Sequence, residues 1–192
     1  MRLFSASPLA LAGALSLALS LGACATLPAT RNTPFLPAGV FGTYQDNDIG
    51  AINQSAWAFA SPANTRGNPI EAARAIIALE YLSGELPENP RWVGMGSTIK
   101  FRINEARGDL RHIVGIRPDA PPQLVVNALL ALAWDLQFGN QTAALQALAS
   151  PVFTQPPRVT LQALSNLPYV QTANLATVRA AEVEFPGGGV RG

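Results

Sequence analysis

Two carboxylates stand in apolar stretches of the sequence, where burial could turn an acidic side chain into a catalyst. Glu80 lies in "AIIALEYLSG" and Asp135 lies in "QLVVNALLALAWDLQF". A carboxyl group in an apolar cleft acquires a raised pKa, so it keeps its proton and can act as a general acid. Single-glutamate enzymes of the cell wall work in this way. Glu80 and Asp135 are therefore the candidate catalytic acids.

Both acids also have a structural interpretation. A buried carboxylate commonly belongs to an ion pair or caps a helix backbone. The basic residues that could pair with them are Arg74, Arg102 and Arg107. Asp135 could instead continue a polar stripe, because it follows Gln123 and Asn127 at multiples of four residues. The sequence leaves the catalytic and the structural interpretations open.

His112, in "GDLRHIVG", is the one histidine of the chain. A Ser-His-Asp site would have to use this imidazole, but the sequence has no GxSxG elbow that marks a nucleophilic serine. A histidine near a helix end is the structural interpretation of His112. Because one histidine and one cysteine leave only carboxylates as further ligands, we expect no metal site and no cofactor.

The stretch "GMGST", residues 94–98, resembles a Gly-rich loop that opens a helix. Backbone amides at Gly96 and Ser97 could hold an anion at the helix N-terminus. A phosphate-binding P-loop needs a lysine directly after its last glycine, and Ser97 stands in that place. The structural alternative is that Ser97 is the N-cap of the helix that follows.

The only cysteine, Cys24, directly follows an apolar N-terminal segment. Arg2 provides a positive charge, and residues 9–21, "LALAGALSLALSL", have the length and composition of a signal-peptide core. As a helix this run would span about 20 Å, which is short of the roughly 30 Å of bilayer hydrocarbon. The sequence therefore predicts a signal peptide over residues 1–23 rather than a permanent membrane span.

The four residues "LGAC" that end at Cys24 resemble the lipobox of bacterial lipoproteins. The resemblance covers only the first two dozen residues. It implies that the Cys24 sulfur carries a diacylglycerol with acyl chains such as palmitate, and that cleavage occurs before the cysteine. Several acyl chains would form a durable membrane anchor. The alternative is ordinary secretory cleavage after Ala23, with an incidental cysteine.

The lipoprotein resemblance also implies an address. Ala25, and not an aspartate, follows the cysteine. Under the sorting rule of enterobacterial lipoproteins, this residue implies passage to the outer membrane, on its periplasmic face. We therefore expect a cell-envelope protein that contacts the membrane through its N-terminal lipid.

The chain beyond the signal peptide is electrically neutral. It has twelve basic and twelve acidic residues, and charged residues make up 13% of the whole sequence. A nucleic-acid-binding surface would need a basic cluster, which the sequence lacks, so we expect no nucleic-acid partner. About 150 residues with 48% hydrophobic composition over the whole chain suit one folded domain.

Proline and glycine divide the chain into segments. Residues 24–42 carry Pro28, Pro34 and Pro37 without sustained periodicity, which predicts a lipidated tether. The "PGGGVRG" run predicts a disordered tail over residues 186–192. Between them, residues 43–185 form the expected domain.

The expected domain consists of helices. No alternating strand pattern of useful length occurs, and caps and breakers separate amphipathic runs. The sequence predicts a single all-α bundle of six or seven helices, at about residues 48–59, 69–82, 97–113, 121–138, 141–150, 159–166 and 171–182. Asp48, Asn68 and Asn140 are the expected caps of the first, second and fifth helices. Ser83-Gly84 is the expected end of the second helix, and Pro168 is the expected break before the last.

Two of these helices carry specific expectations. The helix from Ser97 has an apolar stripe, with Arg107 and Arg111 on its other faces. The helix over 121–138 has so few polar residues that we expect it to be the central helix, packed on nearly all sides. Leu129, Leu132 and Leu136 should lie in the core.

Two function classes remain. No motif supplies a nucleophile, a metal or a cofactor site, so we expect a membrane-anchored envelope lipoprotein whose helical domain is a non-catalytic docking or structural module. Its partner would be another envelope protein. The alternative is an anchored hydrolase or lyase of peptidoglycan or another envelope polymer, working through Glu80 or Asp135. An exposed apolar patch would favour docking, and a cleft faced by a desolvated carboxylate would favour the enzyme.

Overall fold

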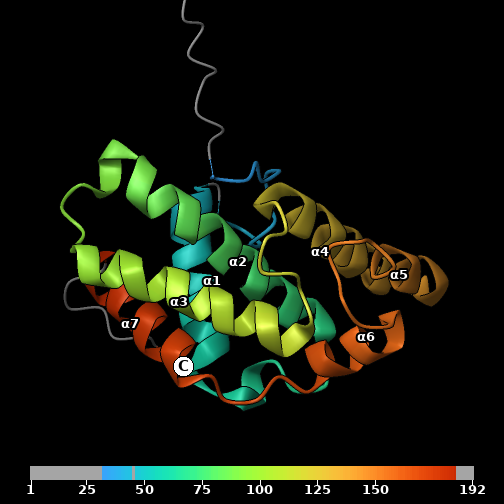
Figure 1. Ribbon diagram of the computed structural model, residues 1–192. Coiled ribbons are helices and arrows are strands. Elements are labelled where there is room, and N and C mark those ends of the chain that lie inside the picture. Colours follow the sequence, from blue (N-terminus) through green and yellow to red (C-terminus); the bar gives the residue numbers. More distant parts are fainter. Residues whose placement is uncertain (1–31, 45, 185–192) are drawn as a thin grey trace, which may run out of the picture. The chain divides into compact units, whose positions relative to one another are not determined.

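The structure is a computed structural model that describes residues 32–44 and 46–184, which belong to one compact unit. Within these ranges the regular structure is entirely helical (Figure 1), which confirms the predicted all-α bundle. Two short 3-10 helices, η1 (Pro62–Asn64) and η2 (Pro90–Trp92), lie between α-helices. The α-helices are α1 (Asn47–Ala60), α2 (Pro69–Glu88), α3 (Ser97–Val114), α4 (Pro122–Gln137), α5 (Gln141–Ala147), α6 (Pro157–Ser165) and α7 (Gln171–Glu184).

Helix α2 occupies the centre of the bundle. It packs against α1, α3, α4 and α6, and Figure 1 shows it running between these neighbours. Ala72, Ala73, Ala75 and Ala78 are fully buried on different sides of α2, because small side chains let other helices approach it closely. The expectation that the helix over 121–138 is central was therefore wrong.

Helix α4 packs on one side only. Leu129 and Leu132 are fully buried, as predicted, and Leu136 is partly buried against the core. Leu124 and Trp134, on the opposite side of the same helix, are exposed. The outer side of α4 therefore combines exposed apolar residues with the polar residues of the helix, Gln123, Asn127, Asp135 and Gln137.

The segment before α1 is part of the packed domain. Leu36, Val40 and Phe41 are buried in the hydrophobic core, so the prediction that they belong to the tether was wrong. The segment is tied to α4 by the Gln123 side chain, which accepts from the Phe35 amide at 2.6 Å and donates to the Phe35 carbonyl at 3.2 Å.

Gly84 does not end α2, which continues through Pro87 to Glu88. A Cβ at Gly84 would lie only 2.5 Å from the backbone nitrogen of Thr33. The glycine therefore provides room for the N-terminal segment to cross the helix, and the predicted end at Ser83-Gly84 was wrong. In the sequence, a glycine that lets a distant segment approach a helix looks the same as a glycine that ends the helix.

Two of the four N-caps predicted from the sequence are confirmed. The side chains of Asn68 and Asn140 cap α2 and α5, as predicted. Asp46 and not Asp48 caps α1, and Gly96 and not Ser97 occupies the N-cap position of α3. Among the described helices, none is both long enough and apolar enough to cross a bilayer.

Candidate functional site

Glu80 is the most deeply buried of the candidate acids, and Arg111 neutralises it. The Nε atom of Arg111 donates to Oε1 of Glu80 at 2.6 Å, and Nη2 donates to Oε2 at 2.7 Å. The Glu80 side chain is fully buried and that of Arg111 almost fully. The pair thus joins α2 to α3 as a bidentate ion pair inside the bundle.

The remaining donors of Arg111 are also occupied. Its Nη1 atom donates to the carbonyls of Pro118 at 2.8 Å and Ala120 at 3.0 Å, with a longer contact to that of Arg117 at 3.3 Å. Arg111 therefore fixes the α3–α4 loop as well as Glu80. The sequence predicted that Arg111 lies outside the apolar stripe of its helix and on an outer face, and this prediction was wrong.

Arg107 is the second cation near Glu80. Its Nη1 atom lies 3.9 Å from Oε2 of Glu80, so one of the three partners considered from the sequence is close to this acid. Burial lowers the pKa of the Arg107 guanidinium, and the Glu80 charge opposes this shift. Arg74 pairs with Glu71 at 2.6 Å instead. Glu80 is therefore held between two arginines and away from solvent.

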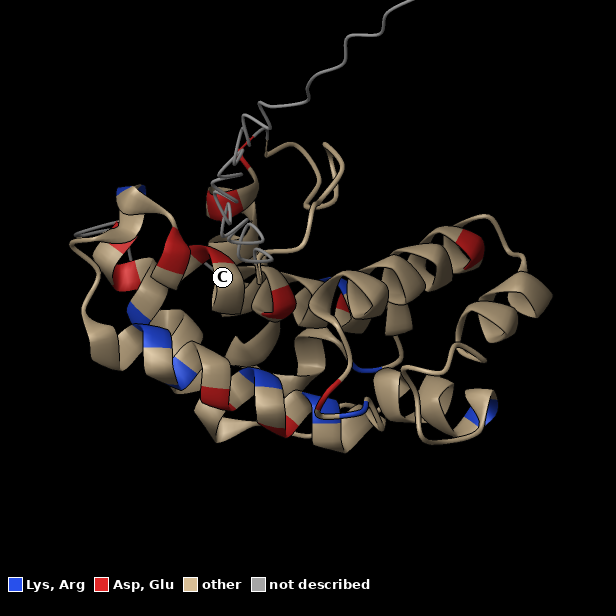
Figure 2. Ribbon diagram, turned by 45° about the horizontal axis from the view of Figure 1, so that its top comes forward, with Lys and Arg blue, Asp and Glu red and all other residues tan. Residues whose placement is uncertain are grey.

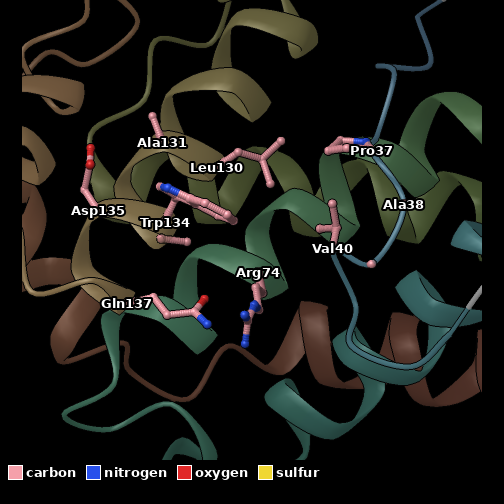
Figure 3. A pocket seen from close by; sticks show the side chains of 11 residues that line it. Pro37, Ala38, Val40, Arg74, Leu130, Ala131, Trp134, Asp135 and Gln137 are labelled. Carbon is pink, nitrogen blue, oxygen red and sulfur yellow. The ribbon is translucent and has the colours of Figure 1, made fainter.

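Asp135 lines an open pocket of about 580 Å³ between α4 and the N-terminal segment. Apolar groups form most of the lining, with Val40 on one side and Leu130 and Trp134 on the other. Figure 3 shows the Trp134 indole projecting toward the N-terminal segment, whereas the Asp135 carboxylate points to the opposite side. Arg74 supplies a cation to the same pocket.

Exposed apolar side chains extend from this pocket along α4, beside the polar side chains of Asn127 and Asp135. Trp134 is 65% exposed and Phe138 is 66% exposed, and their ring centroids lie 4.8 Å apart. Leu124 is exposed near the start of the helix, and Phe35 is exposed beside it on the N-terminal segment. We call Phe35, Leu124, Trp134 and Phe138 together the α4 face.

His112 lies apart from the two acids. It is exposed and borders a shallow hollow of about 330 Å³, which Asp109, Tyr169 and Thr172 also line. The Thr172 hydroxyl donates to Asp109 at 2.7 Å, and the Tyr169 hydroxyl donates to Asn174 at 3.1 Å. Both hydroxyls are therefore engaged with other groups, and the histidine is not brought together with Glu80 or Asp135.

Gly96 and Ser97 form an open helix start. Gly96 is the N-cap of α3 and Ser97 is its first residue, and the helix has no side-chain cap. Both residues are exposed. The start of α3 is therefore open to water, and a glycine and a serine alone do not define an anion site.

The structure also contains a polar cluster that sequence reasoning missed. Asp48 is buried and accepts from the Tyr81 hydroxyl at 2.6 Å, from the Trp92 indole at 3.0 Å and from Arg91 at 3.2 Å. Burial, and then the Asp48 carboxylate, raises the pKa of Tyr81 far above its usual range. The sequence signal for this cluster was the presence of two aspartates, Asp46 and Asp48, at the start of one helix. One aspartate is enough to cap a helix, so the second could bind other groups.

The neighbouring Asp46 is an exposed member of this cluster. Burial opposes its ionisation, but a 2.6 Å hydrogen bond from Arg91 and the amides of Ile49 and Asp48 outweigh that effect and lower the pKa of Asp46. The Arg91 guanidinium also lies over the Trp92 ring, 4.8 Å from its centroid. The cluster therefore joins α1, α2 and η2.

The predicted lipidation residue, Cys24, lies outside the described residues. In the part of the chain that the structure does describe, no group of three or more His, Cys, Asp or Glu side chains could hold a metal ion. Comparisons with family models, with curated proteins and with solved structures found no significant match.

Proposed function

We propose that this chain is a cell-envelope lipoprotein, anchored through lipid on Cys24, whose helical domain is a non-catalytic docking module. The observation that carries the proposal is the α4 face. A lipid anchor holds the domain at a membrane, and the α4 face gives it an apolar surface to dock with. The outer membrane, on its periplasmic side, is the proposed location.

The pairing of Glu80 weakens the enzymatic alternative. A general acid must hold a proton and touch the leaving group of its substrate. Both oxygens of Glu80 instead accept from Arg111, and its side chain has no exposed surface. Neither oxygen is therefore free to contact a substrate. Glu80 therefore acts as a structural anion between α2 and α3.

The exposed aromatic residues favour docking. Monomeric proteins seldom leave neighbouring large apolar side chains in water, and such patches commonly mark interaction sites. Trp134 and Phe138 stack against each other on the outer side of α4, although the same helix has a buried apolar side. Nothing in the packing of the bundle requires these two rings to be aromatic.

Asp135 is the basis of a second candidate function. It lines the 580 Å³ pocket, whose volume falls within the range of small-ligand sites. An anchored hydrolase or lyase of an envelope polymer would use Asp135 there. Asp135→Asn separates the two functions: a variant that folds and accumulates normally but loses its envelope function would favour the enzyme.

Oxidative footprinting tests the docking proposal. Hydroxyl radicals oxidise exposed Trp and Phe side chains, so reactivity reports whether a surface is covered. We expect Trp134 and Phe138 to react less in intact envelopes than in the purified chain from Ala25 onward, which carries no lipid and needs no detergent. Phe101, on the charged surface of α3, is 68% exposed and should react equally in both. Equal reactivity of Trp134 in both preparations would refute docking through the α4 face.

A further inference from the structure

We infer that the α4 face docks on the lipid surface of the membrane that holds the anchor. This inference rests on the proposed anchoring and names the partner of the docking surface. The face would place its aromatic side chains among the lipid headgroups, with α4 lying along the membrane plane.

The distribution of charge is the first argument. Between Asp119 and Arg179 the sequence contains only two charged residues, Asp135 and Arg158. Figure 2 shows the consequence: coloured segments are frequent on α2 and α3, whereas α4 and α5 are almost entirely tan. Charged groups lose hydration when they approach hydrocarbon, so a surface with few of them can approach a bilayer at a lower cost. Asp135 is the one charged residue of α4, and it would lie at the level of the hydrated headgroups.

The residue types on the α4 face are the second argument. Tryptophan is enriched at membrane interfaces because its ring is largely apolar and its indole N–H can still bond to water or headgroups. Trp134 has this chemistry, and Phe138 and Leu124 add apolar area on the same side of α4. From Leu124 to Phe138 the helix rises about 21 Å at ~1.5 Å per residue, so the face is long enough for α4 to lie flat.

The connection to the anchor is the third argument. The Gln123 side chain holds the backbone of Phe35 at the start of α4. Eleven residues lead from Cys24 to Phe35, and a chain of this length reaches at most about 40 Å. The anchor therefore keeps the α4 face close to the bilayer at a high effective concentration, where weak apolar contacts are sufficient for docking.

The lipid partner can be tested with tryptophan fluorescence. The lipidated protein that begins at Cys24 is reconstituted in liposomes of neutral phosphatidylcholine, whose acyl chains are brominated near the headgroup. Bromine quenches tryptophan by contact. The chain has three tryptophans: Trp134 on the α4 face, exposed Trp57 on α1, and buried Trp92. We expect brominated lipid to quench Trp134.

Matched variants identify the quenched residue. Trp134→Phe should remove most of the quenching, whereas Trp57→Phe should retain it. Phe138→Ser should weaken the quenching by disturbing the α4 face, and Phe101→Ser, an equally exposed position on α3, should leave it unchanged. Quenching that persists in Trp134→Phe and disappears in Trp57→Phe would overturn the inference.

The remaining outcomes separate the possible partners. Quenching of Trp134 at all protein densities supports the lipid surface. Burial of Trp134 that requires high protein density, without bromine quenching, would identify a second copy of the chain and refute the lipid surface. Protection of Trp134 in intact envelopes but no quenching in liposomes would refute the lipid surface and leave the docking proposal standing. Absence of both effects would refute both proposals.

Discussion

Arg111 holds both carboxylate oxygens of Glu80, at 2.6 and 2.7 Å, across the interface between α2 and α3. Each partner is removed from water, so each depends on the other for its electrostatic stabilisation. The same guanidinium also binds the carbonyls of the loop that leads to α4. This ion pair therefore sets the position of three elements at once.

Arg111→Met should destabilise the protein by about 3–5 kcal/mol, because it leaves the buried Glu80 carboxylate with one distant cation. Urea denaturation measures the change. Arg102→Met, at an exposed position on the same helix, should change stability by no more than about 0.5 kcal/mol. A loss below about 1 kcal/mol for Arg111→Met would contradict the buried ion pair.

Tyr81→Phe should lower stability at pH 7 by about 1–3 kcal/mol, since the buried Asp48 loses a hydrogen-bond donor. The raised pKa of Tyr81 means that the native protein keeps the phenolic proton when the unfolded chain begins to lose it. Wild-type stability should therefore decline as the pH rises above about 10, and this decline should be shallower in Tyr81→Phe. Denaturation between pH 7 and 11 tests the slope. Tyr169→Phe, at an exposed site, serves as the control.

Leu132→Ala should cost about 2–5 kcal/mol, because the fully buried side chain would leave a cavity. Leu124→Ala, on the exposed side of the same helix, should change stability by less than about 0.5 kcal/mol. Thermal or chemical unfolding compares the two. Similar losses for both variants would contradict the one-sided packing of α4.

Gly84→Ala should destabilise the protein, although alanine ordinarily stabilises a helix relative to glycine. The added methyl group would lie 2.5 Å from the Thr33 backbone nitrogen, so the N-terminal segment must move. Limited proteolysis should then cut more readily within residues 32–44. In Gly108→Ala the new methyl group meets no atom within 4 Å, so this variant should gain about 0.5–1 kcal/mol. A gain of that size in Gly84→Ala would contradict the close approach.

Cys24→Ser should abolish lipid attachment, because the thioether forms through the sulfur atom. The variant should accumulate as an uncut precursor, or be released as soluble protein if another signal peptidase cleaves it. Wild type should incorporate labelled fatty acid and partition into detergent. A cleaved Cys24→Ser protein that remained in the membrane fraction would contradict the anchor. Wild type in the inner-membrane fraction would contradict only the proposed sorting.

The sequence predicted the helices where the deciding signals are local. Asn68 before Pro69, the cap at Asn140 and the breaker at Pro168 each act within one turn of the backbone, and each separates elements in the structure. Gly84 was misjudged because its role depends on Thr33, which is distant in sequence. A glycine that ends a helix and one that admits another segment look alike in a single chain.

The site was harder to predict than the helices, for a physical reason. The periodicity of α3 places Arg111 outside the apolar stripe. Arg111 is nevertheless buried, because it pairs with Glu80 on α2. Similarly, an apolar helix can be packed on all sides within its own domain, or it can leave apolar side chains exposed to a binding partner. The residues of α4 are compatible with both arrangements, and contacts between helices decide between them.

The route of the N-terminal segment has a mechanical consequence. Asn32 bonds to Glu88 of α2, Phe35 to Gln123 of α4, and the Leu36 carbonyl to Asn47 of α1. A pull transmitted through the anchor would reach these contacts before it reached the main bundle, and three helices would share the load. The segment should therefore distribute a pulling force over three helices, so that tension at the membrane does not unwind α1 at its first residue.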